Sequence, residues 1–137
     1  MKHTLRKVKS AVINFLKPAK RYITLRRKRV LEFPETIQLP ITYSCNFDCV
    51  MCGMHHMTGR RDFTASELRT ILHDKLFSRV TGIGVSGGEP FLKPDLTECI
   101  RAMAETLPRL RSFSFISNGY FTDRILSRLR EIKEICT

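Results

Sequence analysis

Three cysteines, Cys45, Cys49 and Cys52, lie within one eight-residue stretch of the segment ITYSCNFDCVMCG. Cysteine thiolates are soft ligands that bind iron–sulfur clusters and zinc. A cubane cluster has four irons, so three cysteines would leave one iron without a protein ligand. An open coordination position is where a metal site can perform chemistry. The C-x3-C-x2-C spacing therefore predicts a metal or cluster site with one free position.

A second group of residues that could take part in chemistry is the GGEP segment, residues 87–90, which begins 35 residues after Cys52. It closes the strand-like run GIGVSGGEP, and the consecutive Gly87 and Gly88 would let the backbone approach a ligand closely. Ser117 and Asn118 end a third strand-like run and could supply further polar contacts.

Each of these features also has a purely structural interpretation. The cysteines could hold structural zinc, with His55 or His56 as the fourth ligand. The two glycines could form a tight turn, and Glu89 could cap a helix or pair with an arginine. The dipeptide Asn118-Gly119 is common in turns.

The elements that position these residues follow a strand–helix alternation. The pattern predicts strands at residues 36–42, 82–86 and 112–117. It also predicts a helix that is capped by Thr64 or Ser66 and runs to residue 77, and helices at 94–106 and from 122 to the end of the chain. Apolar strands alternating with helices indicate an α/β fold with a parallel sheet and right-handed crossovers. In such folds the functional site forms at the carboxyl ends of the strands. Because each motif follows one strand, we expect the three motifs to form one site.

The charge of the chain is concentrated in its first residues. The net charge is +11, yet residues 1–31 contain eleven Lys and Arg and no Asp or Glu, whereas residues 32–137 contain thirteen of each sign. This predicts a basic arm at residues 1–33 with an amphipathic helix, followed by one folded domain, the body, at residues 34–137. The arm could pack its apolar stripe on the body or bind a membrane surface. Few aromatic residues and no recognised module disfavour nucleic acid as a partner.

Cysteine usage and hydropathy indicate the compartment. Five cysteines, three of them clustered, do not form the pattern of a disulfide framework. The sequence has no apolar run of membrane-spanning length and no signal-peptide pattern. We therefore expect a reducing cytoplasmic location, which could be peripheral at the membrane through residues 1–31.

Together, the cysteine motif and the GGEP motif resemble those of the radical S-adenosylmethionine (radical SAM) enzymes, and the resemblance extends from Pro34 to Glu134. It implies a [4Fe-4S] cluster on the three cysteines, with SAM chelating the open iron. An electron from the cluster would cleave SAM to a 5′-deoxyadenosyl radical that abstracts hydrogen from a substrate.

The resemblance also implies roles for further residues. The family's GGE motif contacts the methionine amino group of SAM, and it maps to Gly87, Gly88 and Glu89. Met51 stands where the family often has an aromatic residue, and a methionine can pack against the adenine ring.

The family core is a six-unit partial (β/α) barrel similar to a TIM barrel, and this chain has room for about the first three units. The expected fold is thus the N-terminal, truncated half of a radical SAM core. The implied partners are SAM, an electron donor such as flavodoxin or ferredoxin, and an unknown substrate. The detailed residue sequence of the motifs suggests that this substrate is a peptide. The alternative is a non-catalytic metal-binding or interaction fragment.

Overall fold

The computed structural model of the protein describes residue 23 and residues 32–57 and 59–135. From Phe33 onward these residues belong to one compact unit, Phe33–Thr137. The basic arm predicted for residues 1–33, with its amphipathic helix, lies almost wholly outside the described residues. Among the helices of the described part of the chain, none combines the length and apolar character needed to cross a bilayer.

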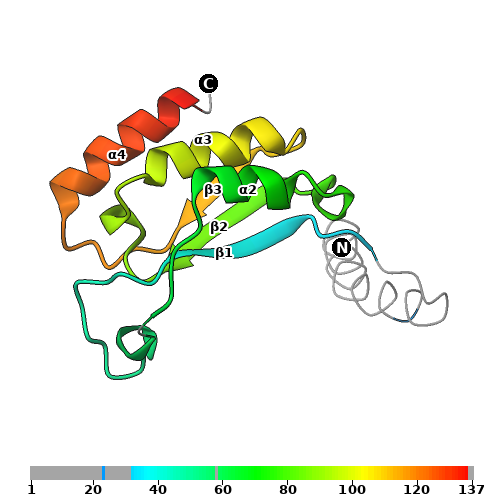
Figure 1. The fold of residues 1–137 in the computed structure, drawn as a ribbon. Helices are drawn as coiled ribbons and strands as arrows, with labels where there is room; N and C mark the ends of the chain where they lie inside the picture. Colours follow the sequence, from blue (N-terminus) through cyan, green and yellow to red (C-terminus); the bar gives the residue numbers. More distant parts are fainter. Residues whose placement is uncertain (1–22, 24–31, 58, 136–137) are drawn as a thin grey trace, which may run out of the picture. The chain divides into compact units, whose positions relative to one another are not determined.

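The centre of the unit is a parallel sheet of three strands (Figure 1). The strands are β1 (Thr36–Thr42), β2 (Gly82–Gly87) and β3 (Ser112–Phe115), and they lie in the order β1-β2-β3. In the register, Ile83 of β2 pairs with Ile37 of β1 and with Phe113 of β3. The predicted α/β fold with a parallel sheet is therefore confirmed.

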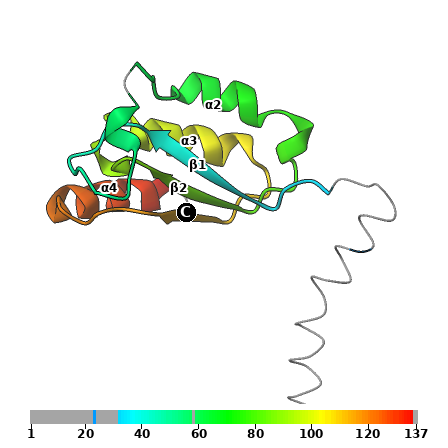
Figure 2. The same ribbon diagram turned by 90° about the horizontal axis from the view of Figure 1, so that it is seen from below.

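Three α-helices cover one face of this sheet, as the two ribbon views show (Figures 1 and 2). They are α2 (Ala65–Leu72), α3 (Leu96–Thr106) and α4 (Thr122–Ile135). The buried core between helices and sheet includes Leu68, Leu72, Ile83, Val85, Ile100, Met103 and Ile132. Because consecutive parallel strands with helices on one face bring all their carboxyl ends to one edge, the motifs after β1, β2 and β3 share that edge.

Several element boundaries differ from the sequence-based expectation. Strand β2 ends at Gly87 rather than at residue 86, and α3 begins at Leu96 rather than at residue 94. The helix expected at residues 64–77 ends at Leu72, because Asp74 accepts a hydrogen bond from the Leu76 amide (2.7 Å) and starts a separate 3₁₀ turn. The start of this helix is as expected, with a capping box formed by Thr64 and Glu67. Strand β3 ends at Phe115 rather than at residue 117, because the following residues turn toward a buried carboxylate.

The end of β1 carries a bulge that matters for the site. The register with β2 shifts between Pro40 and Thr42, so the strict alternation of exposed and covered side chains stops there. As a result, the consecutive residues Ile41 and Thr42 are both buried. The Thr42 side chain is thereby directed to the loop that follows the strand, where its hydroxyl donates to Asp62 (2.6 Å).

Candidate functional site

Three segments meet at the carboxyl edge of the sheet. We call them the cysteine loop (residues 43–62, after β1), the glycine segment (residues 87–95, from the last residue of β2 onward) and the β3 exit (residues 116–121). Hydrogen bonds join the glycine segment to both of the others, and a further bond joins the cysteine loop to the β3 exit. The motifs that the sequence places on three separate strands therefore lie together.

The two glycines lie directly against the start of the cysteine loop. The Gly88 amide donates to the Thr42 carbonyl oxygen, and the Glu89 amide donates to the Ser44 carbonyl oxygen, both at 2.8 Å. A Cβ atom on Gly88 would lie 2.2 Å from the same Ser44 oxygen and 3.1 Å from the Cβ of Cys45. Gly87 has a φ of +121°, which favours glycine. Gly87 thus requires glycine because of its φ and its closeness to the Thr42 carbonyl oxygen, and Gly88 because the loop backbone approaches so closely.

The Glu89 carboxylate is buried, with 1% of the residue exposed, and is the hydrogen-bond centre of this edge. It accepts a bond from the Phe91 amide at 3.1 Å, which caps a short 3₁₀ turn. It also accepts from the Ser117 hydroxyl (3.1 Å) and from the Asn118 amide (2.8 Å). The carboxylate therefore holds the β3 exit against the glycine segment.

The β3 exit in turn contacts the cysteine loop. The Asn118 side-chain amide donates to the side-chain oxygen of Asn46 at 2.9 Å. The rings of Phe47 and Tyr120 pack edge to face with centroids 5.4 Å apart, a preferred aromatic geometry. Ser117 and Asn118, predicted as site residues, are thus within this edge and adjoin the loop that carries the cysteines.

The three cysteines occupy the outer part of the loop. Cys45 is half-buried and its sulfur accepts a 3.5 Å hydrogen bond from the Phe47 amide, whereas Cys49 and Cys52 are exposed. Met51 is 96% exposed between them. Among the described residues, no three His, Cys, Asp or Glu side chains are grouped so as to hold one metal ion. Binding of a single ion by all three thiolates would therefore require them to converge.

A charged group that the sequence analysis did not single out lies behind the loop. Lys93 is only 5% exposed, and its ammonium lies 2.8 Å from an Asp95 oxygen and 3.8 Å from an Asp62 oxygen. Partial burial raises the pKa of Asp95, but the hydrogen bond and charge of Lys93 outweigh it and hold this pKa below its ordinary value. The only sequence signal was a lysine within the apolar stretch PFLKP.

Cys99, on α3, differs from the loop cysteines in environment. Burial, followed by the adjacent Asp95 carboxylate, raises the pKa of its thiol to about 12. Since the thiolate is the reactive form, iodoacetamide at pH 8 should alkylate Cys49 and Cys52 in the native chain and leave Cys99 unmodified. Peptide mass mapping checks this, with the urea-unfolded chain as the control in which Cys99 also reacts.

The raised pKa of the Cys99 thiol also affects stability. Because it favours the folded state only while the thiol is neutral, this contribution to stability falls as pH rises from about 9 toward 12.

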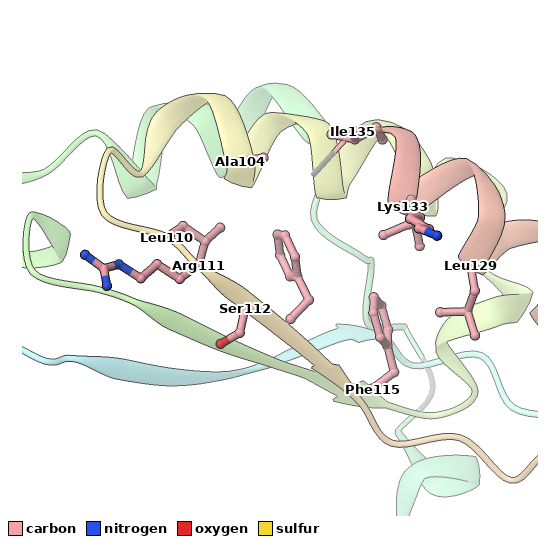
Figure 3. Close-up of a pocket in the computed structure, with 10 residues that line it drawn as sticks. Ala104, Leu110, Arg111, Ser112, Phe115, Leu129, Lys133 and Ile135 are labelled. Carbon is pink, nitrogen blue, oxygen red and sulfur yellow. The ribbon is translucent and has the colours of Figure 1, made fainter. Parts of the chain in front are cut away.

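A separate cavity of about 650 Å³ lies beside strand β3 (Figure 3). It is lined by residues of β3 and α4 and by Ala104 of α3, with apolar side chains such as Phe115 and Leu129 and with the charged Arg111 and Lys133. Its lining includes no residue of the cysteine, GGEP or Ser117-Asn118 motifs in the part of the chain that the structure describes. This cavity is thus distinct from the motif edge.

Comparisons with known proteins agree on one family. The sequence profile of the radical SAM superfamily matches residues 39–136. A "Probable GTP 3',8-cyclase" of Sulfolobus acidocaldarius is 27% identical over 101 residues, covering 71% of this chain and 31% of that protein. A "GTP 3',8-cyclase" of Vibrio cholerae serotype O1 is 30% identical over 100 residues, covering 69% of this chain and 30% of that protein. The chain thus spans about 30% of the length of these curated relatives.

Among solved structures, the crystal structure of BtrN in complex with AdoMet and 2-DOIA matches with a TM-score of 0.60 at 21% sequence identity. The match covers 78% of this chain and 44% of that chain. At this identity the similarity concerns the fold alone.

Proposed function

Because the chain belongs to the radical SAM superfamily, we propose that Cys45, Cys49 and Cys52 bind a [4Fe-4S] cluster at which SAM is cleaved. The observation that carries this proposal is the contact of Gly88 with Ser44 and Cys45, which sets the GGEP backbone beside the cysteine loop. The donor set fits the group, since three thiolates are available and the Cys45 sulfur already accepts an amide hydrogen bond of the kind that tunes such ligands.

A cluster with one iron open to SAM would supply the electron that yields a 5′-deoxyadenosyl radical for hydrogen abstraction from a substrate. The residues of this chain would bind and orient the cofactor. We assign the backbone of Gly87 and Gly88 to the amino group of SAM and the exposed Met51 side chain to the adenine. Glu89 would act through Ser117 and Asn118, because its carboxylate already accepts their hydrogen bonds and is buried.

We further propose that residues 34–137 form the first three units of a partial (β/α) barrel. One support is that all three described helices lie on the same face of the sheet, as in a barrel. Another is the cavity beside β3, whose apolar lining would be covered by a further strand and helix. The cyclases match over only about 30% of their length, so the match supports the proposed SAM chemistry but no particular substrate.

The remaining partners follow from the proposed chemistry. An electron donor such as flavodoxin or ferredoxin would reduce the cluster, and the substrate could be a peptide. A reducing cytoplasm suits free thiolates. The basic charge of residues 1–33 would suit attachment to an anionic membrane surface.

The test is anaerobic reconstitution of the 137-residue chain with iron and sulfide, followed by iron analysis and electron paramagnetic resonance after reduction. About four irons per chain are expected. Each of the variants Cys45→Ala, Cys49→Ala and Cys52→Ala should lose the signal. Incubation with SAM and dithionite should then release methionine and 5′-deoxyadenosine from the loaded chain.

The matched control is the double variant His55→Ala/His56→Ala, which removes the histidines that a zinc site would use. Under the proposal it keeps the iron–sulfur signal of the parent chain. Stoichiometric zinc that is lost in this variant, without an iron chromophore in the parent chain, would contradict the proposal and favour the non-catalytic alternative.

A further inference from the structure

Lys93 is a buried cation that the proposed cluster chemistry does not use. Lysine is almost never buried unless it is paired, and here 5% of the residue is exposed. Its ammonium contacts two carboxylates, one from a residue that precedes Lys93 in the chain and one from a residue that follows it. Asp95 lies just beyond it, at the start of α3, and Asp62 is the last residue of the cysteine loop. Lys93 therefore connects the end of that loop with the helical layer.

Asp62 ties the end of the loop back to its beginning. One of its oxygens accepts the Thr42 hydroxyl (2.6 Å), and the other accepts the Tyr43 amide (2.9 Å). The Thr42 hydroxyl oxygen also accepts the Ser44 amide at 3.1 Å. The first and last residues of the loop thus meet at the bulged end of β1, and the charge of Lys93 lies behind their junction.

We propose that Lys93 is a positioning residue for the cysteine loop, whose ammonium holds Asp62 against the end of β1. The glycine segment then fixes both ends of the loop: Gly88 and Glu89 hold its beginning through backbone contacts, and Lys93 holds its end through charge. The identity of what the cysteines bind rests on the proposed function, whereas the geometry of the loop does not.

Two features of the site indicate that the positive charge of Lys93 is needed to hold Asp62 in place. Asp62 and Asp95 are both partly withdrawn from water, with 28% and 43% of their side chains exposed, and both face the same ammonium. Without that ammonium, two like charges would share a partly buried space, which disfavours the ionised pair. The less constrained partner is Asp62, because it belongs to a loop and Asp95 begins a helix. The loop end is therefore the part that should move.

The experiment is hydrogen–deuterium exchange with mass spectrometry on the full chain, iron-free and after anaerobic loading, for the parent chain and Lys93→Met. In the iron-free variant, amides of residues 43–62 should exchange about 10- to 100-fold faster, since the Thr42 and Tyr43 hydrogen bonds to the charged Asp62 carboxylate weaken once that carboxylate has lost its facing cation. Amides of α3 and β2 should keep the protection of the parent chain. In the loaded variant, iron should pass to a chelator faster than from the parent chain.

The control is Arg69→Met, which removes an exposed ion pair with Glu105 (2.9 Å) between α2 and α3 and should leave loop exchange unchanged. Asp62→Asn removes the charge on the loop side of the same contact and keeps the side-chain shape. It should show the same faster exchange of the loop amides if Lys93→Met does not fold. Unchanged loop exchange in the variants that fold would overturn the proposal, as would an equal rise in α3 and β2. Failure of the proposed function would show separately, as absence of an iron–sulfur signal in the parent chain.

Discussion

Replacement of Gly88 by alanine should lower the free energy of unfolding by about 3 kcal/mol or more, the upper range for overpacking of a tight site. The added methyl group would lie 2.2 Å from the Ser44 carbonyl oxygen and 2.7 Å from its carbon, which are backbone atoms that cannot rotate away. The loop must shift, and the 2.8 Å bond from the Glu89 amide to the same oxygen is then lost. Urea unfolding followed by circular dichroism measures the change.

The matched control for this substitution is Gly53→Ala. Gly53 follows Cys52 in the same loop, has a φ of −83° and has open space where a Cβ would lie. Its replacement should leave stability within about 0.5 kcal/mol of the parent chain, as for ordinary surface changes. After anaerobic reconstitution, Gly88→Ala should also hold less iron than Gly53→Ala. Equal stability of the two variants would show that the loop does not press on the glycine segment.

The second large effect is expected for Glu89→Gln. The substitution keeps the shape of the side chain but turns one carboxylate oxygen into an NH2 group that faces the donors Phe91, Ser117 and Asn118. At least one buried amide or hydroxyl loses its acceptor, which should lower the free energy of unfolding by about 2–3 kcal/mol. Urea unfolding gives the magnitude, and proton exchange at the Asn118 amide should rise in parallel.

Glu98→Gln is the comparison, because Glu98 is an exposed residue of α3 whose ion pair with Arg101 spans 3.7 Å. Such a surface pair contributes about 0–1 kcal/mol. If both glutamine variants lost the same stability, the Glu89 carboxylate would have no special part in joining the glycine segment to the β3 exit.

Local patterns were sufficient to predict much of the fold. The start of α2 depends on Thr64 and Glu67, three residues apart, and strand β1 was predicted with its observed bounds. The parallel sheet followed from the alternation of apolar strands with helices. The presence of the motifs at the carboxyl edge followed from the same topology, since each motif comes directly after a strand.

What the sequence did not predict depends on partners far apart in the chain. Strand β3 is short because Ser117 bonds to Glu89, 28 residues earlier. The burial of Lys93 depends on Asp62, at the end of a loop whose path no periodicity describes. The bulge that buries both Ile41 and Thr42 is a feature of the pairing with β2, so it has no local signal.

The bond between Asn46 and Asn118 joins residues 72 positions apart, and this separation has a consequence for the order of events during synthesis. At ribosomal rates of ~5–20 residues per second, the cysteines precede that partner by about 4 to 14 s. Lys93 and Glu89 also follow them. The nascent chain therefore displays its thiols before the groups that arrange them exist, and of the three only Cys45 becomes half-buried in the folded chain. Metal delivery that follows folding would meet an ordered loop, whereas earlier delivery would meet three unconstrained thiols.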